Sequence, residues 1–515
     1  MAGATAVRAA AASLSDGITA SGGQRVPITL PFTGEVGHEL PHSTLDDVTD
    51  AAARARAAQH AWQAAGFAHR RRVLLAAHDL LLARRGELID LLQLETGRSR
   101  GPAFEEFFQG VNITRYAAVH ARRVLAPHRR RAGIPLAITT EVQYEPKQLV
   151  GVVTPWNYPL GLALMDIVPA LAAGCAVLQK PDDQAALSVL AARACFIEAG
   201  VPAELWAVVT GPGESVGNAL IDTVDHLCFT GSTRTGAAVG QRAAARLIGS
   251  SLELGGKNAV IVLDDVNIPD AVPAVANACF AAAGQLCVSA ERILVQRSIA
   301  EPFIAALASH VAALRLGPDL DYSADVGSLA TAAQLERVRA HVEDAVVKGA
   351  TVLAGGQHRP DLGPFFFEPT LLSGVSAGMA CHGEETFGPV AAITVIEDDE
   401  EAIAAANASD FGLNAAVFGS PARAARIARR LHSGSVNINE GFRASFSSVD
   451  APQGGMRRSG LGRRNGPEGI LRFAQPRTVS RATGLIRLPQ HGAEYPPLTG
   501  LMVTLLQVLN ALRRR

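Results

Sequence analysis

Short runs of strand-forming residues alternate with helical runs along most of this chain, and this alternation constrains the fold more than any other feature. The first series begins with LVGVVTPW at residue 149 and ends with DHLCFTGS, and the second begins with NAVIVL at residue 258 and ends with GSVNIN. Strands that alternate with helices favour βαβ units, in which helices cover both faces of a parallel sheet. We therefore predict two α/β domains.

The segments before and between these series have patterns of their own. Residues 43–124 show an apolar period of 3.6 residues, which is typical of amphipathic helices. The stretch AITTEVQYEP, residues 137–146, alternates in polarity and predicts an edge strand that reaches a neighbouring subunit. The N-terminal stretch MAGATAVRAAAASLSDG is too weakly apolar for the core of a signal peptide, so we expect a disordered leader there.

The overall composition narrows the classes of partner. The chain has 47 Lys and Arg against 48 Asp and Glu, a formal net charge of −1, which argues against a nucleic-acid partner and favours small molecules. Its six cysteines form no CxxC pair and lie near no histidine cluster. They indicate reduced thiols in the cytoplasm, with neither a disulfide framework nor a metal site.

The C-terminal stretch LTGLMVTLLQVLNALRRR predicts an amphipathic helix. Its apolar span is shorter than the ~20 residues that cross a bilayer. The helix could pack on its own or a neighbouring subunit, or it could lie on a membrane surface with the help of Arg513, Arg514 and Arg515. The leucines that share one face are Leu498, Leu501, Leu505, Leu509 and Leu512.

One cysteine has an unusual setting. Cys287 follows the small residues of AAAGQL, at a predicted loop between a helix and the strand RILVQ. Free cysteines are mostly buried packing residues. Small neighbours, however, allow a ligand to approach closely, and a thiolate is a strong nucleophile. Cys287 is thus a candidate nucleophile.

Three further stretches carry candidate polar groups. Glu253 in LELGGKN could act as a general base, or it could form a salt bridge with Lys257 or another cation. Asn157 in TPWNYP follows a strand end, where it could cap the next helix or donate to an oxyanion. The stretch FTGSTRTG, which contains Ser232, opens a helix whose N–H groups could receive a phosphate, although it equally fits a tight turn.

Taken together these stretches resemble the aldehyde dehydrogenase superfamily from about residue 30 to residue 480. The matches occur in the family's order: TPWNYP, LQKPD, FTGSTRTG, LELGGKN, GQLC, EETFGP and PQGGMRRSGLG. The chain is most similar to the second type of bacterial NADP-dependent succinate-semialdehyde dehydrogenase, notably at RLIGSSLELGGKN, DLGPFFFEPT and RRNGPEG. The resemblance implies an α/β fold with a Rossmann-like cofactor domain, a catalytic domain and a small β extension for oligomerisation.

The resemblance also implies domain boundaries and a homodimer or homotetramer. The expected parts are a leader at 1–30, an NAD(P)-binding domain at 31–124 and 146–255, a catalytic domain at 256–455, oligomerisation strands at 125–145 and 470–485, and a C-terminal extension at 486–515.

The family's chemistry, carried onto this chain, makes Cys287 the nucleophile that attacks an aldehyde. The Cys287 backbone N–H and the Asn157 side chain would hold the oxyanion, and Glu253 would activate the water that hydrolyses the thioester. Asp183 near the adenosine ribose favours NAD, whereas the most similar subfamily uses NADP, so either cofactor is expected. The implied cofactor contacts are Thr154, Pro155, Trp156, Lys180, Asp183, Gly231, Ser232, Gly255, Glu385 and Phe387.

The substrate is less constrained than the chemistry. The arginines that read a carboxylate in better-known succinate-semialdehyde dehydrogenases correspond here to Ala281 and Met165. Arg443 could replace them, or it could be a solvated loop residue. A tunnel for a longer apolar or aromatic aldehyde could instead be lined by Tyr158, Met165, Phe442 and Phe446.

Two other functions compete with hydrolytic aldehyde oxidation. In a CoA-acylating aldehyde dehydrogenase the acyl group passes to a thiol, and Glu253 argues against this because such a transfer has less need of a water-activating base. An inactive structural paralogue is the other alternative, and it conflicts with the joint presence of Cys287, Asn157 and Glu253.

Overall fold

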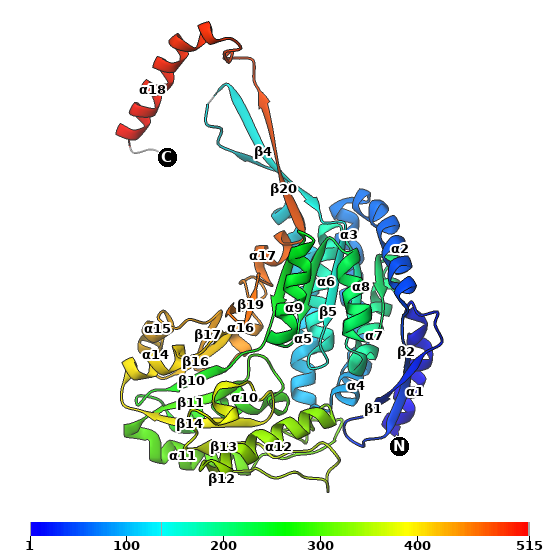
Figure 1. The fold of residues 1–515 in the computed structure, drawn as a ribbon, viewed down its shortest axis with the longest axis vertical. Helices are drawn as coiled ribbons and strands as arrows, with labels where there is room; N and C mark the ends of the chain where they lie inside the picture. The colour runs from blue at the N-terminus through cyan, green and yellow to red at the C-terminus, as the bar shows by residue number, and fades with distance from the viewer. Residues whose placement is uncertain (1, 135, 513–515) are drawn as a thin grey trace. The chain divides into compact units, whose positions relative to one another are not determined.

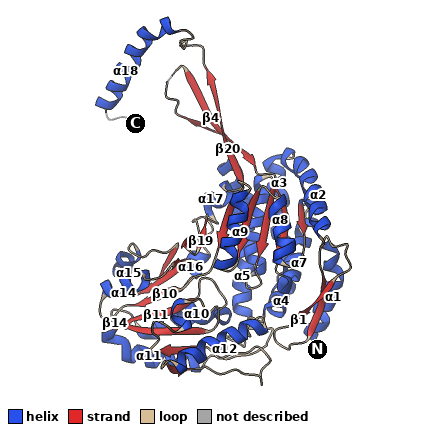
Figure 2. Ribbon diagram, viewed as in Figure 1, coloured by secondary structure: helices blue, strands red, loops and turns tan. Residues whose placement is uncertain are grey.

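The computed structural model describes residues 2–134 and 136–512. Contacts divide the chain into two units, one comprising Met1–Val124 and Pro146–Ala474 and the other Leu125–Glu145 and Gln475–Arg515. The first unit contains two parallel-rich sheets with helices packed against them (Figures 1 and 2). These sheets confirm the predicted α/β class.

The first sheet of this unit has the strand order β19-β9-β8-β5-β6-β7 among the described residues. Strands β5 to β9 run parallel, and β19 pairs antiparallel with β9. The runs of valine and leucine in these strands are buried, as expected for strands covered on both faces. Their bounds are β5 Leu149–Thr154, β6 Ala176–Pro181, β7 Trp206–Val208, β8 His226–Thr230, β9 Gly249–Glu253 and β19 Gly460–Leu461.

The second sheet has the order β12-β13-β14-β11-β10-β16-β17 within the described chain. All neighbouring strands in it are parallel except β12 and β13. The bounds are β10 Asn258–Val262, β11 Ala290–Gln296, β12 Thr351–Ala354, β13 Thr370–Ser373, β14 Val390–Ile396, β16 Asn414–Phe418 and β17 Ser435–Ile438. Two short strands, β15 Phe411–Gly412 and β18 Met456–Arg457, pair separately.

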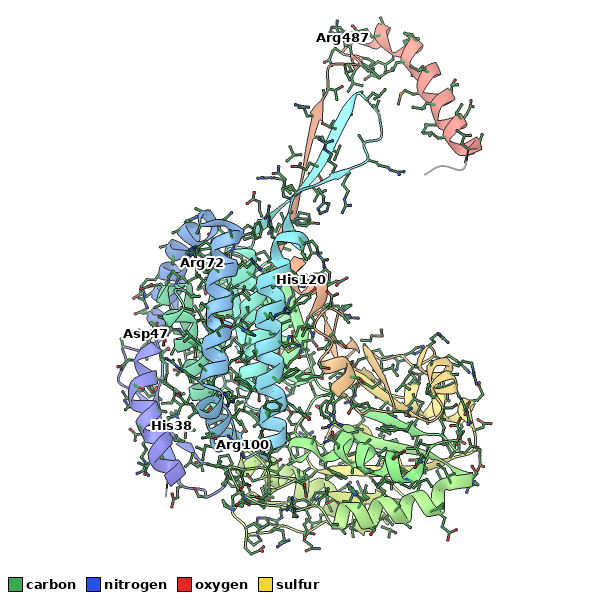
Figure 3. The ribbon with its side chains drawn as sticks, turned by 180° about the vertical axis from the view of Figure 1, so that it is seen from behind. His38, Asp47, Arg72, Arg100, His120 and Arg487 are labelled. Atoms are coloured by element: carbon green, nitrogen blue, oxygen red, sulfur yellow. The ribbon has the colours of Figure 1, made fainter. Side chains whose placement is uncertain are left out.

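Long helices precede the first sheet, as the apolar period predicted. Thr44 and Asp47 form a capping box at the start of α2, which fixes the beginning of this helix (Asp47 is labelled in Figure 3). The helices of this segment are α2 Leu45–Ala64, α3 Gly66–Ala83, α4 Arg85–Thr96 and α5 Arg100–Leu125.

The remaining helices of the first unit connect the strands. They are α6 Pro159–Ala173, α7 Ala186–Glu198, α8 Asn218–Thr223, α9 Thr233–Ala245, α10 Ile268–Phe280, α11 Arg297–Ala312, α12 Ala332–Val347, α13 Ala380–Gly383, α14 Asp399–Asn407, α15 Pro421–Ala428, α16 Arg443–Phe446 and α17 Gly466–Leu471. Every residue of α6 is buried, because this helix lies between the sheet and the helices α3 and α7.

The N-terminal region is ordered, so the expected disordered leader is wrong. Residues 2–30 contain helix α1 Ala2–Leu14 and strand β1 Arg25–Thr29, which pairs antiparallel with β2 Val36–Pro41. Val7 and Ala11 are buried where α1 packs on β2 and α7. An alanine-rich stretch with little apolar character thus folds because tertiary contacts cover its small apolar face.

The second unit contains a strand and a C-terminal helix where the sequence predicted them, but the expectation that residues 137–146 form an edge strand is wrong, because that strand is paired on both sides. Strands β20 Ala474–Ala482, β4 Ile138–Pro146 and β3 His128–Arg130 form a sheet in this order. Helix α18 spans Tyr495–Ala511 and has no buried residue, while Arg513, Arg514 and Arg515 lie outside the described residues. In the described chain, none of the helices combines the length and apolar character that a bilayer crossing requires.

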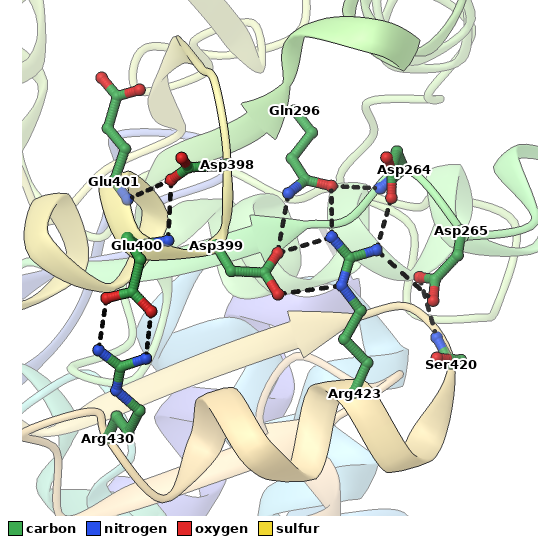
Figure 4. Close-up of polar contacts among 10 residues, drawn as sticks. All are labelled: Asp264, Asp265, Gln296, Asp398, Asp399, Glu400, Glu401, Ser420, Arg423 and Arg430. Atoms are coloured by element: carbon green, nitrogen blue, oxygen red, sulfur yellow. Dashed lines mark hydrogen bonds and ion pairs between the residues drawn. The ribbon is translucent and has the colours of Figure 1, made fainter.

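A network of charged residues lies at the C-terminal ends of β10, β11 and β14 (Figure 4). Arg423 of α15 donates to Asp399 at 2.6 Å and to Asp264 at 2.5 Å. Gln296, the last residue of β11, donates to Asp399 at 2.9 Å. The Asp399 carboxylate thus links β11 and α15 to α14. Nearby, Arg430 forms a bidentate pair with Glu400.

Candidate active site

A cleft of about 260 Å³ opens at the C-terminal ends of β5, β8 and β9, where α/β sheets bind their ligands. The predicted residues that line it are Pro155, Trp156, Asn157, Gly231, Ser232, Glu253, Gly255, Cys287, Glu385 and Phe387. These residues lie as many as 232 positions apart in the sequence, and the fold brings them into one cavity. Leu162, Thr230, Leu254, Gln334 and Arg337 also line it and were not predicted.

The cysteine at this cleft is held by an unusual backbone turn. Ala282, Ala283 and Gly284 have φ angles of 50°, 54° and 69°, all in the left-handed region. A Cβ at Gly284 would lie 2.1 Å from the carbonyl oxygen of Gly388, so this position accepts only glycine. Consecutive left-handed alanines cost free energy, and such strain is characteristic of functional sites.

Cys287 differs from the other cysteines in its exposure. Among the six, all of which lie in the described chain, Cys287 is partly exposed and the others are buried. The Asn258 side chain donates to the Cys287 carbonyl oxygen at 2.7 Å and fixes the backbone beside the cleft. Burial, reinforced by Glu385 and Glu253, raises the pKa of the Cys287 thiol to about 12. The thiol is therefore protonated in the ligand-free cleft.

Glu253 is the last residue of β9 and is buried with one unsatisfied oxygen. Its side-chain Oε1 has no hydrogen-bond partner among the described residues. Burial raises its pKa to about 7, against the opposing charges of Arg464 and Arg472. The alternative salt bridge to Lys257 is not formed, because Lys257 pairs with Glu291 instead. With a pKa raised to about 7, the Glu253 carboxylate can accept a proton near neutral pH.

A second buried carboxylate lies behind Glu253. Asp166 of α6 accepts from Arg464 at 2.6 and 2.9 Å and from Arg472 at 2.6 Å. Burial alone would raise the pKa of Asp166, but the two guanidinium groups outweigh it and hold this pKa below its usual value. Arg464 also donates to Thr230, which lines the cleft.

Asn157 directs its amide toward the cysteine loop rather than capping a helix. Tyr158, not Asn157, is the N-cap of α6, and no side chain caps this end. Asn157 Nδ2 donates to the carbonyl oxygen of Gln285 at 2.9 Å. A side-chain amide has two N–H groups, so the second remains available to a ligand. Buried Arg98, which pairs with Glu106, donates to the Asn157 carbonyl oxygen and fixes this loop.

The carboxylate of Glu291 holds the loop that contains Glu385 and Phe387. Glu291 of β11 accepts from the backbone N–H groups of Thr386 and Phe387 at 2.9 Å. Glu385 Oε1 accepts from the Gly256 N–H at 2.8 Å, and burial raises the pKa of Glu385 to about 8. The rings of Phe387 and Trp156 meet edge to face at 5.6 Å between centroids.

Ser232 caps helix α9 at the other end of the cleft. Its hydroxyl accepts from the Thr235 N–H at 3.2 Å, which satisfies one of the free donors at this helix start. The other N–H groups of the first turn form a donor set suited to a diphosphate. The ligand-binding chemistry of a dinucleotide thus fits this end of the first sheet.

Three of the residues expected at the cofactor lie outside the cleft. Thr154 is buried behind it and accepts from Gln179 at 3.3 Å. Lys180 and Asp183 lie at the C-terminal end of β6, with 3.9 Å between Lys180 Nζ and Asp183 Oδ1. His42, which sequence reasoning missed, is within 2.8 Å of Asp183.

None of the residues expected at the substrate is among the described residues that line this cleft. The rings of Tyr158 and Phe446 meet edge to face at 6.1 Å, and the Tyr158 hydroxyl has no hydrogen-bond partner among the described residues. Met165 is buried within α6. Arg443 is half-exposed but not free, because it donates to Glu440 at 2.7 Å and lies 3.6 Å from Glu105. It is therefore neither an unpaired anion reader nor a purely solvated side chain.

Comparisons with known proteins agree with this geometry. A protein of Mycolicibacterium smegmatis named "Putative succinate-semialdehyde dehydrogenase NADP(+)" is 45% identical over 458 residues, which cover 89% of each chain. The crystal structure of betaine aldehyde dehydrogenase from Staphylococcus aureus in complex with NAD+ is similar with a TM-score of 0.86 and 31% identity, covering 92% of this chain and 95% of that one. An NAD-dependent aldehyde dehydrogenase from Sinorhizobium meliloti has a TM-score of 0.88 and 32% identity over 92% of this chain and 95% of its own.

The family comparison covers most of the chain. The profile described as "Aldehyde dehydrogenase family" matches residues 18–479, which include both sheets and every residue that lines the cleft. The resemblance drawn from the sequence motifs is thereby confirmed. The chain belongs to the aldehyde dehydrogenase family.

Proposed function

We propose that this protein oxidises an aldehyde to a carboxylic acid through a covalent intermediate on Cys287. The observation that carries the proposal is the convergence of a partly exposed thiol, an amide donor and a buried carboxylate with an unsatisfied oxygen on one cleft. In the first step the Cys287 thiol gives its proton to solvent water and its sulfur adds to the carbonyl carbon. The free N–H of Asn157 and the Cys287 backbone N–H stabilise the resulting oxyanion.

The second half of the reaction needs a base. When bound, NAD(P)+ supplies the acceptor for the hydride that leaves the carbonyl carbon. The product on Cys287 is a thioester, and Glu253 takes a proton from the water that attacks it. The balance is one aldehyde, one NAD(P)+ and one water giving one carboxylate, one NAD(P)H and two protons.

The cleft supports a nicotinamide dinucleotide as the cofactor. Trp156, Gly231, Ser232, Glu385 and Phe387 would hold it, with the diphosphate at the start of α9. The relatives support both forms, since one is named for NADP(+) and another was crystallised with NAD+.

Succinate semialdehyde is the first candidate substrate, on the strength of the mycobacterial relative's name. A second candidate, an apolar or aromatic aldehyde, is favoured by the geometry near Tyr158. Arg443 is neutralised by Glu440 and Glu105, and the Tyr158–Phe446 pair presents aromatic surface. The carboxylate of succinate semialdehyde would need a free cation, whereas an apolar chain would need only this surface.

A panel of aldehydes tests the proposal and separates the candidates. Succinate semialdehyde, benzaldehyde and a long-chain alkanal are assayed with NAD+ and NADP+, with and without CoA. Carboxylate formation without CoA is expected, and product that requires CoA would contradict the role of Glu253. Cys287→Ser should lower turnover by about 10⁴-fold or more, because the nucleophile is lost. Arg443→Ala should leave the KM for succinate semialdehyde unchanged if Arg443 is not its carboxylate reader.

We also propose that β20 and β4 mediate assembly into a homodimer or homotetramer. Strand β20 lies at the edge of its sheet and is exposed along almost its whole length. An exposed edge strand offers unpaired backbone groups to another chain. Light scattering of the full chain against a variant with Val479→Lys tests whether this edge carries the contact.

A further inference from the structure

A compact polar group lies at the C-terminal ends of β6 and β7. Asp183 follows β6, Gly211 follows β7, and His42 follows β2. The strand order reverses between β5 and β8, so β6 is the second strand of a dinucleotide-binding half. In such folds an acidic residue after the second strand reads the 2′ position of the adenosine ribose, and Asp183 occupies this place.

Both carboxylate oxygens of Asp183 already have protein donors. His42 Nε2 lies 2.8 Å from Oδ2, and the Gly211 N–H lies 3.1 Å from Oδ1. His42 is 7% exposed, and its other ring nitrogen has no partner among the described residues. The ring is therefore fixed chiefly by its contact with Asp183.

A cation and a glycine-containing turn lie beside this group. Lys180 Nζ lies 3.9 Å from Asp183 and brings a positive charge to the same place. The turn Gly213–Gly217 borders Lys180, since a Cβ added at Gly217 would lie 3.9 Å from Lys180 Cδ, and a Cβ added at Gly213 in the same turn would meet no atom within 4 Å. A free Asp183 carboxylate would repel a 2′-phosphate beside Lys180, whereas a carboxylate held by donors repels it less.

We propose that His42 determines cofactor specificity, because its bond to Asp183 lets this subsite accept a 2′-phosphate beside Lys180. The inference rests on the proposed function, since it requires a dinucleotide at this sheet. Removal of His42 frees one oxygen of Asp183, which shifts the preference from NADP+ toward NAD+.

Binding of two nucleotide fragments tests this without turnover. Adenosine 2′,5′-bisphosphate and 5′-AMP differ only in the 2′-phosphate, and calorimetry on the full chain gives the Kd of each. His42→Ala should weaken binding of the bisphosphate relative to 5′-AMP by about tenfold. Asp183→Asn in the His42→Ala background should restore most of this loss, and His42→Gln, which keeps an N–H donor, should resemble the wild type.

His38→Ala is the matched control. His38 lies in the adjacent strand β2, and neither of its ring nitrogens has a partner among the described residues (labelled in Figure 3). It should leave the ratio of the two Kd values unchanged. If His42→Ala does not fold, Asp183→Asn alone must raise affinity for the bisphosphate. An unchanged ratio in His42→Ala or Asp183→Asn overturns the role of His42, whereas a wild type that binds neither fragment overturns the proposed function itself.

Discussion

The cleft and the buried layer behind it each contain a carboxylate, and the two carboxylates have opposite surroundings. Asp166 is fully paired with two arginines, whereas Glu253 has an oxygen without a partner. The pKa of Asp166 is held below its usual value, and that of Glu253 is raised to about 7. Asp166 and Glu253 are both buried, so their charged and hydrogen-bonding partners account for the difference. The paired carboxylate stabilises the fold, and the carboxylate with an unsatisfied oxygen can accept a proton.

Asp166→Asn should have the largest effect on stability. It leaves Arg464 and Arg472 buried without their counter-charge, which costs about 3–5 kcal/mol in the free energy of unfolding. Urea unfolding at pH 7 measures this loss. The lowered pKa of Asp166 means that its stabilisation is present at neutral pH and is lost as the solution is acidified through that pKa. A variant as stable as the wild type at pH 7 would show that the two arginines are not counter-ions of Asp166.

Glu253→Gln should stabilise the protein at alkaline pH. A glutamate whose pKa rises from 4.5 to about 7 on folding destabilises the folded state once it ionises, by about 3 kcal/mol above pH 7. The gain should therefore appear at pH 8 and vanish at pH 4, where Glu253 is protonated in both states. Unfolding at the two pH values measures it, and an equal gain at both would mean that ionisation is not the cause.

Turnover should depend on pH in the direction that the raised pKa of Glu253 dictates. Only the ionised carboxylate can accept a proton from water, so kcat should fall by about tenfold per pH unit well below pH 7. A rate profile under saturating aldehyde and cofactor measures this. Arg464→Gln is a useful comparison, because loss of this positive charge should raise the pKa of Glu253 and move the midpoint upward. An unchanged midpoint would show that Arg464 does not act on Glu253.

The surface network around Arg423 should show the smallest effect. Arg423→Ala removes charge-assisted hydrogen bonds to Asp264 and Asp399 at a partly exposed site and should cost about 1 kcal/mol (Figure 4). Arg430→Ala, at an exposed pair, should leave the Tm unchanged. A loss after Arg423→Ala as large as that after Asp166→Asn would contradict the contrast between buried and surface ion pairs.

The fold and the lining of the cleft were accessible from the sequence because their signals are local. The alternation of apolar runs predicted two parallel sheets, and Asn157, Ser232 and Glu253 follow strand ends that a parallel sheet must bring to one edge. Cys287 was recognisable from its small neighbours.

The ion pairs and hydrogen bonds that set the charge states near the cleft could not be predicted from the sequence, because their partners are distant in the chain. Arg464 and Asp166 are 298 residues apart, and His42 and Asp183 are 141 residues apart. No periodicity links such pairs. Helix α1 was missed for a related reason. Its apolar face is small and becomes buried only through contacts with β2 and α7, which are distant in the sequence.

A rapid-mixing experiment on Glu253→Gln separates acylation of Cys287 from hydrolysis of the thioester. One equivalent of NAD(P)H per Cys287 should form in a fast burst, because attack and hydride loss need no base at residue 253. A slow steady state should follow, because the thioester then lacks its water-activating carboxylate. Mass spectrometry should find the acyl group on Cys287. Steady turnover at the wild-type rate, with no burst and no acylated Cys287, would contradict this mechanism.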